Sequence, residues 1–196
     1  MTRIFFAILF ISSILSAQAV FSDSDKEIFE SKINLIVESG LSNKPISEIF
    51  VAVAKSFLGT DYEANTIEPD SDEKLVVHLS GLDCYTFIES SLALARIIVL
   101  GKSDFDSFLK QLQEIRYRAG IIIEYPSRLH YFSDWIFDND IRKIIEDITE
   151  DIGGVRYKNN VSFMSSHPES YKQLKENTIF IKKMRETEIE ISQRSY

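Results

Sequence analysis

The sequence has 196 residues, a net charge of -8 at neutral pH and 44% hydrophobic residues. This length suits one domain with a sizeable core. The acidic balance argues against nucleic acid and anionic membrane surfaces as partners, because both reward clusters of Lys and Arg.

Residues 1–19 have the pattern of a cleavable signal peptide. Arg3 precedes an apolar stretch over 4–15, and the small residues at 17–19 suit a signal peptidase. The alternative is a retained membrane anchor, but the stretch is shorter than the roughly 20 residues that cross a bilayer. We expect an exported protein, periplasmic or secreted, with residues 20–196 as one domain that does not stay inserted in the membrane.

Helical spacing of apolar side chains predicts four helices in the first part of this domain. Gly, Pro and Ser residues mark their ends. The predicted helices run from about Asp25 to Ser39, from after Pro45 to Gly59, from near Cys84 to Gly101, and onward from Ser103.

The rest of the chain predicts mixed structure. Residues 75–79, 121–125 and 129–137 are rich in β-branched and aromatic types and are expected to be strands or extended segments. Isoleucines at helical spacing predict a further helix over 141–152, and a short helix is expected after Pro168. The predicted fold class is α+β, with the helices grouped early in the chain.

Cys84 is the single cysteine of the chain, so no internal disulfide can form. One interpretation is a buried apolar cysteine, which is common in protein cores. The other is functional, because Asp83 sits where a helix N-cap belongs and places Cys84 in the first turn. There the helix dipole and unpaired N–H groups would stabilise a thiolate nucleophile and could receive an oxyanion. Asp83 opposes the dipole, so an imidazole would still be needed as base.

Three histidines could supply that imidazole. His78 lies on a predicted strand and is interpreted as structural, and His167 lies in a predicted loop. His130 has neighbours that are typical of sites for polar or sugar-bearing ligands: Arg128, Tyr131, Asp134 and Trp135. The alternative is an aromatic core whose polar groups satisfy one another, and the residues by themselves leave both interpretations open.

Five stretches of the sequence, taken in order, resemble a known family. They are Phe-Leu-Gly-Thr-Asp-Tyr at 57–62, Leu-Asp-Cys-Tyr-Thr-Phe-Ile-Glu at 82–89, Ile-Arg-Tyr-Arg at 115–118, Ser-Arg-Leu-His-Tyr-Phe-Ser-Asp-Trp at 127–135 and Ser-Phe-Met-Ser-Ser-His-Pro at 162–168. Together they resemble the N-acetylmuramoyl-L-alanine amidase-like family of exported bacterial proteins, relatives of the NlpC-type peptidoglycan cysteine peptidases.

The resemblance implies a papain-like α+β core with N-terminal helices and hydrolysis of an amide bond in peptidoglycan or muropeptides, with Cys84 as nucleophile. Such enzymes carry the catalytic histidine in a His-Val-Gly-like segment after a Gly-Asp-Ile-like strand start, and neither follows His167. Either His130 is the base, or the base belongs to a C-terminal part that this chain lacks. We favour the second, with a sheet that is incomplete at the C-terminus and His130 and its neighbours on the substrate side.

A different function class stays open beside this hydrolase. It is a non-catalytic or decayed peptidoglycan-binding remnant of the same family. A metalloenzyme is disfavoured, because the sequence has no His-Glu-x-x-His run and no cysteine pair. There is also no Gly-x-Ser-x-Gly motif and no phosphate loop. We expect neither a metal nor a cofactor.

Overall fold

A computed structural model describes residues 19–69 and 72–194 of the chain. The predicted signal peptide, residues 1–19, lies outside the described residues except for Ala19. Across the described part, no helix is both long and apolar enough to span a membrane.

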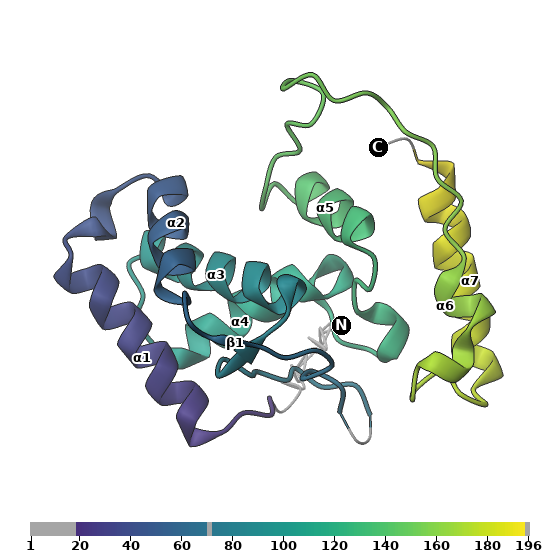
Figure 1. Ribbon diagram of the computed structural model, residues 1–196, viewed down its shortest axis with the longest axis horizontal. Coiled ribbons are helices and arrows are strands. Elements are labelled where there is room, and N and C mark those ends of the chain that lie inside the picture. The colour runs from purple at the N-terminus through teal and green to yellow at the C-terminus, as the bar shows by residue number, and fades with distance from the viewer. Residues whose placement is uncertain (1–18, 70–71, 195–196) are drawn as a thin grey trace, which may run out of the picture.

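The four helices predicted in the first part of the domain are confirmed. They are α1 (Asp23–Glu38), α2 (Ile46–Ser56), α3 (Cys84–Val99) and α4 (Phe105–Arg116), with the short 3-10 helix η1 (Leu41–Asn43) between α1 and α2. Each α-helix turns its apolar face inward, and α3 packs on both α2 and α4 (Figure 1). The core of this part includes Ile36, Ile49, Leu94 and Ile115, whose side chains are fully buried.

The sheet is small. Strands β1 (Asp61–Tyr62) and β2 (Gly81–Leu82) pair in parallel, with Asp61 opposite Gly81. The strand predicted over 75–79 does not form as such, because this segment pairs only through a single parallel bridge from Val76 to Val20. Its side chains still alternate between buried and partly exposed, as in a strand. The described residues therefore form an α+β fold that is mostly helical.

Of the segments 121–125 and 129–137, which were expected to be strands or extended, residues 125 and 132–137 are helical, while Ile121 and Tyr131 have extended backbone. The backbone after α4 forms the 3-10 helices η2 (Arg118–Gly120) and η3 (Tyr125–Ser127) and then α5 (Phe132–Ile141). Strand pairing here is limited to one antiparallel bridge between Tyr117 and Arg128. The aromatic and apolar segment 132–137 is helical rather than a strand, because its side chains pack against α3 and the core and not against a sheet.

The prediction of a helix over 141–152 is also wrong. Helix α5 ends at Ile141, and Lys143 then takes a positive φ of 59°. The backbone carbonyl of Asn139 accepts from the N–H groups of both Ile144 and Ile145, which closes the helix end. The chain from 142 to 162 then runs without a helix, and it forms the long connection over the top of Figure 1.

The C-terminal part of the described chain forms its own helical group. It contains α6 (Phe163–Ser166), the 3-10 helix η4 (Pro168–Ser170), where a short helix was expected, and α7 (Thr178–Gln193). Helix α7, which carries many charged residues, has Asn177 as its N-cap, whose side chain accepts from the Phe180 N–H. In Figure 1, α6 and α7 lie side by side, apart from α1 to α4. A second apolar cluster, which includes Tyr125, Met164, Leu174 and Met184, joins this group to the segment before α5.

Candidate active site

Cys84 is the first residue of helix α3, and its side chain is exposed. The predicted placement in the first helical turn is therefore confirmed, and the alternative of a cysteine buried in the core is not what the structure shows. Strand β2 leads directly into this helix start through Asp83. Strand β2 before Cys84 and helix α3 after it fix the position of the sulfur, and the side chain stays exposed to solvent.

Asp83 caps helix α3. Its Oδ1 accepts from the N–H groups of Tyr85 at 3.0 Å and Thr86 at 2.7 Å, and the Thr86 hydroxyl accepts from the Asp83 N–H at 3.0 Å. The Phe87 N–H donates to the Asp83 carbonyl. Within the described chain, the Cys84 N–H is the one N–H of this first turn that makes no hydrogen bond. The donor that this helix start leaves for an oxyanion is therefore the amide of Cys84 itself.

A cavity of about 120 Å³ lies beside this helix start, and we call it the inner chamber. Asp83 and Tyr85, which flank Cys84, line it. The Tyr85 hydroxyl donates to the Leu129 carbonyl at 2.6 Å and so connects the helix start to the segment that carries His130. The inner chamber is lined by these residues and by Asn65, Ile67, Glu68, Glu89, Arg116, Arg128, Leu129 and His130.

A buried ion pair lines the inner chamber. Glu89 Oε2 accepts from Arg116 Nε at 2.7 Å, and both side chains are almost fully buried. Arg116 also donates to the Val76 carbonyl at 2.5 Å. Glu89 Oε1 is buried without a partner in the described chain. Burial raises the pKa of Glu89, and the charge of Arg116 opposes that rise.

Arg128, a predicted substrate-binding residue, also lines the inner chamber but is itself buried. Its guanidinium donates to Glu68 at 2.7 Å and to the Ile67 carbonyl at 3.2 Å, and it lies 3.4 Å from Glu73. It therefore holds the loop after β1 against the chamber. These two carboxylates balance its charge, but its Nε–H is buried without a hydrogen-bond partner in the described chain.

His130 lines the inner chamber, and its Nε2 lies 2.9 Å from the Tyr125 carbonyl. A carbonyl only accepts, so Nε2 carries the proton and Nδ1 is the remaining basic nitrogen. Burial, assisted by the nearby charge of Arg128, lowers the pKa of His130 to about 3. The imidazole is therefore neutral at ordinary pH and takes up a proton reluctantly.

A second cavity of about 370 Å³ shares Asn65, Glu68 and His130 with the first, and we call it the outer chamber. Tyr131, another predicted substrate-binding residue, lines it. The Tyr131 hydroxyl donates to Glu188 at 2.6 Å and accepts from the Met164 N–H at 3.1 Å. The other lining residues of the outer chamber are Tyr125, Met164, Ser170, Tyr171, Lys172 and Gln173.

The remaining predicted site residues lie elsewhere. Asp134 is buried between Arg118 and Arg194, each at 2.6 Å, and holds helix α5 to η2 and to the end of α7. Trp135 is buried in the core, stacks on Phe132 and lines a separate apolar cavity of about 370 Å³. The structure thus brings Arg128 and His130 together near Cys84, with Tyr131 in the adjoining chamber, and leaves Asp134 and Trp135 outside both chambers.

The other two histidines are placed away from the two chambers. His78 Nε2 lies 3.0 Å from Glu63 Oε2, directly beside β2. This pair passes close over Gly81, where a Cβ atom would come within 2.3 Å of the same carboxylate oxygen. His167 is exposed and stacks on Phe163.

Sequence reasoning missed several residues of the chambers. Asn65, Glu68 and Gln173 lie in polar loops, and nothing in a single sequence separates such residues from ordinary solvated ones. Glu89 did give a signal, because it is a charged residue on the inward face of an otherwise apolar helix. A buried charge in that position requires a partner, here Arg116.

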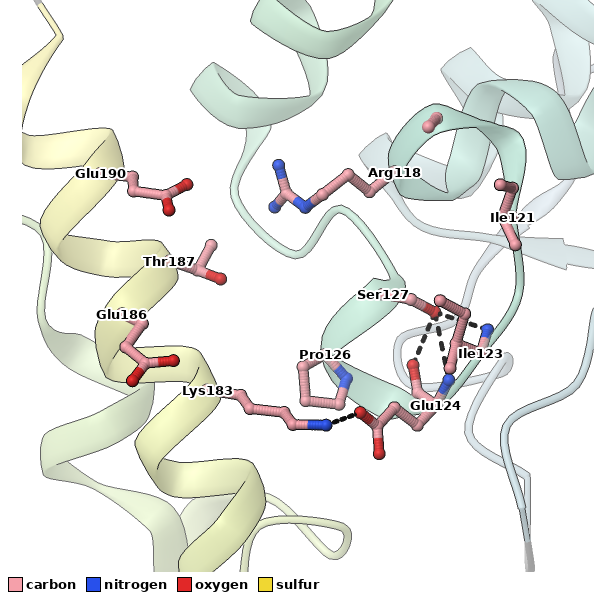
Figure 2. A pocket seen from close by; sticks show the side chains of 11 residues that line it. Arg118, Ile121, Ile123, Glu124, Pro126, Ser127, Lys183, Glu186, Thr187 and Glu190 are labelled. Atoms are coloured by element: carbon pink, nitrogen blue, oxygen red, sulfur yellow. Dashed lines mark hydrogen bonds and ion pairs between the residues drawn. The ribbon is translucent and has the colours of Figure 1, made fainter.

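A further cavity, of about 450 Å³, has neither Cys84 nor its neighbours Asp83 and Tyr85 in its lining (Figure 2 shows the cavity). One wall is the segment from Arg118 to Ser127, and the other is the face of α7 with Lys183, Glu186, Thr187 and Glu190. Lys183 and Glu124 form an ion pair between the two walls. Within residues 19–69 and 72–194, no group of His, Cys, Asp and Glu is placed to hold a metal ion.

Comparisons with known proteins match this chain to a family model and to solved structures. A family model described as N-acetylmuramoyl-L-alanine amidase-like matches residues 52–196. A solved N-acetylmuramoyl-L-alanine amidase from Bacteroides uniformis is 34% identical, with a TM-score of 0.72, over 77% of this chain and 63% of that chain. A candidate xylanase from Bacteroides fragilis is 37% identical, with a TM-score of 0.69, over 73% of this chain and 62% of that chain.

A more distant structure, a protein from Legionella pneumophila, shares the fold. It is 22% identical, with a TM-score of 0.58, over 90% of this chain and 62% of that chain. A search of curated proteins found no match. The chain spans less than two thirds of the length of each of these solved structures. With the family model covering most of its residues, the chain belongs to the N-acetylmuramoyl-L-alanine amidase-like family.

Proposed function

We propose that this chain carries the nucleophile and the substrate groove of a thiol-dependent peptidoglycan amidase. The observation that carries the proposal is the exposed Cys84 at the start of α3, flanked by two residues that line the inner chamber. A helix N-terminus favours a thiolate, which is the competent form of a cysteine nucleophile. The family and the Bacteroides uniformis amidase support peptidoglycan as the substrate.

In this proposal the Cys84 thiolate attacks the carbonyl carbon of the substrate amide. The oxyanion accepts a hydrogen bond from the N–H of Cys84, which the capping side chain of Asp83 does not bind. The C–N bond then breaks, the amine leaves with a proton, and a thioester remains on Cys84. Water hydrolyses the thioester, which releases the acid and regenerates the thiol.

The proton transfer requires a base, and we propose that His130 is not that base. With a pKa of about 3 and its Nε2–H held by the Tyr125 carbonyl, His130 accepts a proton too weakly for efficient catalysis near neutral pH. The resemblance instead assigns the base to a His-Val-Gly-like segment, and the residues that follow His167 contain none. In this view Arg128, His130 and Tyr131 form the part of the groove that binds the substrate.

The same proposal includes a papain-like relationship to the NlpC-type peptidases and export of the protein. A strand that leads into a helix with the cysteine at its first position supports the former. The signal-peptide pattern of residues 1–19 supports the latter, and with it a site in the bacterial envelope, where peptidoglycan lies.

Hydrolysis of purified muropeptides by residues 20–196 tests the proposal. With imidazole supplied in solution as the base, the expected result is release of an amine that Cys84→Ser or iodoacetamide abolishes. If His130→Ala also abolished turnover while the fold and substrate binding were unchanged, His130 would be the base, against our assignment.

The non-catalytic alternative gives a different result in the same assay. A chain that binds peptidoglycan but releases no amine, with or without Cys84, would be a cell-wall-binding module. Co-sedimentation with insoluble peptidoglycan, compared between the unmodified chain and Cys84→Ser, measures that binding independently of chemistry.

A further inference from the structure

The cavity of about 450 Å³ between helix α7 and the segment 118–127 is separate from the groove beside Cys84, and we call it the α7 cavity. It shares no lining residue with the inner or the outer chamber. Its volume lies within the range of about 300–1,000 Å³ that is typical of sites for small ligands. None of its lining residues takes part in the proposed amide hydrolysis, so any ligand of this cavity has a separate role.

The two walls of the α7 cavity carry opposite charges. Glu186 and Glu190 lie on the α7 wall, and Arg118 lies on the wall opposite. Figure 2 shows the Arg118 guanidinium and both carboxylates pointing into the space between the walls. The other charged lining residues, Lys183 and Glu124, pair with each other and so balance. The facing charges therefore offer an anion site on one wall and a cation site on the other.

These charged groups retain capacity for a ligand. Asp134 accepts from the two terminal nitrogens of Arg118, at 3.4 and 2.6 Å, and a guanidinium has five N–H donors in all. Glu190 is exposed, and its carboxylate makes no hydrogen bond or ion pair within the described chain. Glu186 has the exposed Lys182 at 3.9 Å, which is a weak pair.

Between the charged groups the α7 cavity is apolar. Ile121, Ile123 and Pro126 line it, and the two isoleucines are 55% and 75% exposed. An apolar side chain placed over them would remove this surface from water, which is favourable. The backbone that carries this wall is held in place, since the Ala119 N–H donates to Asp138 at 3.2 Å. A ligand that fits has charged ends of opposite sign and an apolar middle.

We propose that the α7 cavity binds a short peptide with a free ammonium group, an apolar side chain and a free carboxylate. Arg118 binds the carboxylate, and Glu186 and Glu190 bind the ammonium group. Ile121 and Ile123 contact the apolar side chain. A single amino acid carries both charges on one carbon atom, and a neutral sugar carries neither, so a peptide of two or three residues fits the two walls better than either. This binding site goes beyond the proposed function and does not depend on it.

Calorimetric titration of residues 20–196 with the tripeptide Ala-Leu-Ala tests the inference. N-terminal acetylation removes the positive end, amidation of the other end removes the negative charge, and Ala-Gly-Ala lacks the apolar side chain. We expect the unmodified tripeptide to bind, and each of these three changes to weaken binding about tenfold, the size of one lost charge-assisted hydrogen bond or one lost apolar contact.

Variants assign the two ends of the peptide. Glu190→Gln should weaken Ala-Leu-Ala about tenfold but leave the affinity of the acetylated form unchanged, because that form has no ammonium group. Arg118→Gln should act in the same way on the carboxylate, with the amidated form unchanged. Glu30→Gln, exposed on α1, is the matched control and should change no affinity. Since Glu190 is exposed, Glu190→Gln tests the site even if Arg118→Gln folds poorly for lack of its contact with Asp134.

Three results would overturn the inference: no heat of binding at millimolar tripeptide, equal affinities of the unmodified and acetylated forms, or an affinity that Glu190→Gln leaves unchanged. Alkylation of Cys84 with iodoacetamide separates this site from the groove. It should leave tripeptide binding intact, because Cys84 is not in the lining of the α7 cavity. Loss of binding on alkylation would place the peptide beside Cys84 and contradict the assignment. A chain that binds the tripeptide through Glu190 but releases no amine from muropeptides would support the inference and count against the catalytic proposal.

Discussion

His130 shows how its surroundings set the chemistry of one residue. Its ring lies 4.3 Å from that of Tyr125, its Nε2–H is bound by the same residue's carbonyl, and Arg128 is close by. A positive imidazolium in that place would be poorly hydrated and would face a like charge. The result is a neutral side chain suited to hydrogen bonding with a ligand rather than to proton transfer.

This depressed pKa predicts a pH dependence of stability. The unfolded chain takes up a proton on His130 near the ordinary pKa of 6.5, whereas the folded chain does so only near 3. As pH falls from 6.5, His130 therefore favours the unfolded state, by roughly 3 kcal/mol at pH 4.5. In His130→Gln, which keeps a donor for the Tyr125 carbonyl but does not titrate, this loss should disappear.

Urea unfolding of the unmodified chain and His130→Gln at pH 6.5 and pH 4.5 measures the effect. Glu73 and Glu89 have raised pKa values, and they act in the opposite sense, because their contribution is lost as pH rises through those values. Comparison of the two chains cancels that common part. An equal pH dependence in both chains would mean that His130 titrates normally.

At the scale of elements, the start of α3 combines a structural and a chemical role in one residue. Asp83 satisfies two N–H groups of the first turn, and its charge also lies next to Cys84. The first role stabilises the helix that carries the nucleophile. The second places a negative carboxylate beside the sulfur, where it repels an approaching anion.

Two substitutions separate these roles. Asp83→Ala removes the cap and should lower the free energy of unfolding by about 1 kcal/mol. Asp83→Asn keeps a capping oxygen but removes the charge, so stability should change little while Cys84 reacts faster with the anion iodoacetate. Thermal unfolding and alkylation rates at fixed pH measure the two effects. Equal alkylation rates in Asp83→Asn and the unmodified chain would show that the carboxylate does not influence the sulfur.

The elements differ in how well the sequence predicts them. Helices α1 to α4 combine apolar periodicity with clear ends, so pattern and capping agree. The isoleucines at 141–152 have the same periodicity, but only Ile144 and Ile145 pack against the core. Ile152 is 76% exposed. The aromatic run at 132–137 has strand-like composition, yet no neighbouring strand exists in the described chain to pair with it. In both cases tertiary contacts decided the structure, and local pattern did not.

At the scale of the whole molecule, the candidate site is assembled from distant parts of the chain. The chambers take residues from the loop after β1, from α3, from the end of α4, from 125–131 and from the C-terminal helical group. Sequence reasoning found Cys84 and His130, because cysteine and histidine are rare and chemically distinctive. It could not find Asn65 or Gln173, because their role depends on loops that Arg128 and Pro69 hold in place.

The N-terminal segment of the described chain contributes to this assembly. The Val20 N–H donates to the Leu75 carbonyl and the Val20 carbonyl accepts from Val77, each at 2.8 Å. Phe21 packs edge-on against Phe105 of α4. Cleavage after Ala19, as the signal pattern predicts, would leave Val20 as the first residue, and its new ammonium group could still donate to Leu75.

Two measurements follow from this arrangement. The intact mass of the exported protein should correspond to a chain that begins at Val20.

A chain begun at Ser22 should unfold more easily than one begun at Val20, by about 1 to 3 kcal/mol, because it loses two backbone hydrogen bonds and an aromatic contact. A chain begun at Ala19 is the control for the position of the terminal charge and should match the one begun at Val20. Equal urea midpoints for the chains begun at Val20 and Ser22 would show that residues 20–21 do not hold the segment before β2 in place.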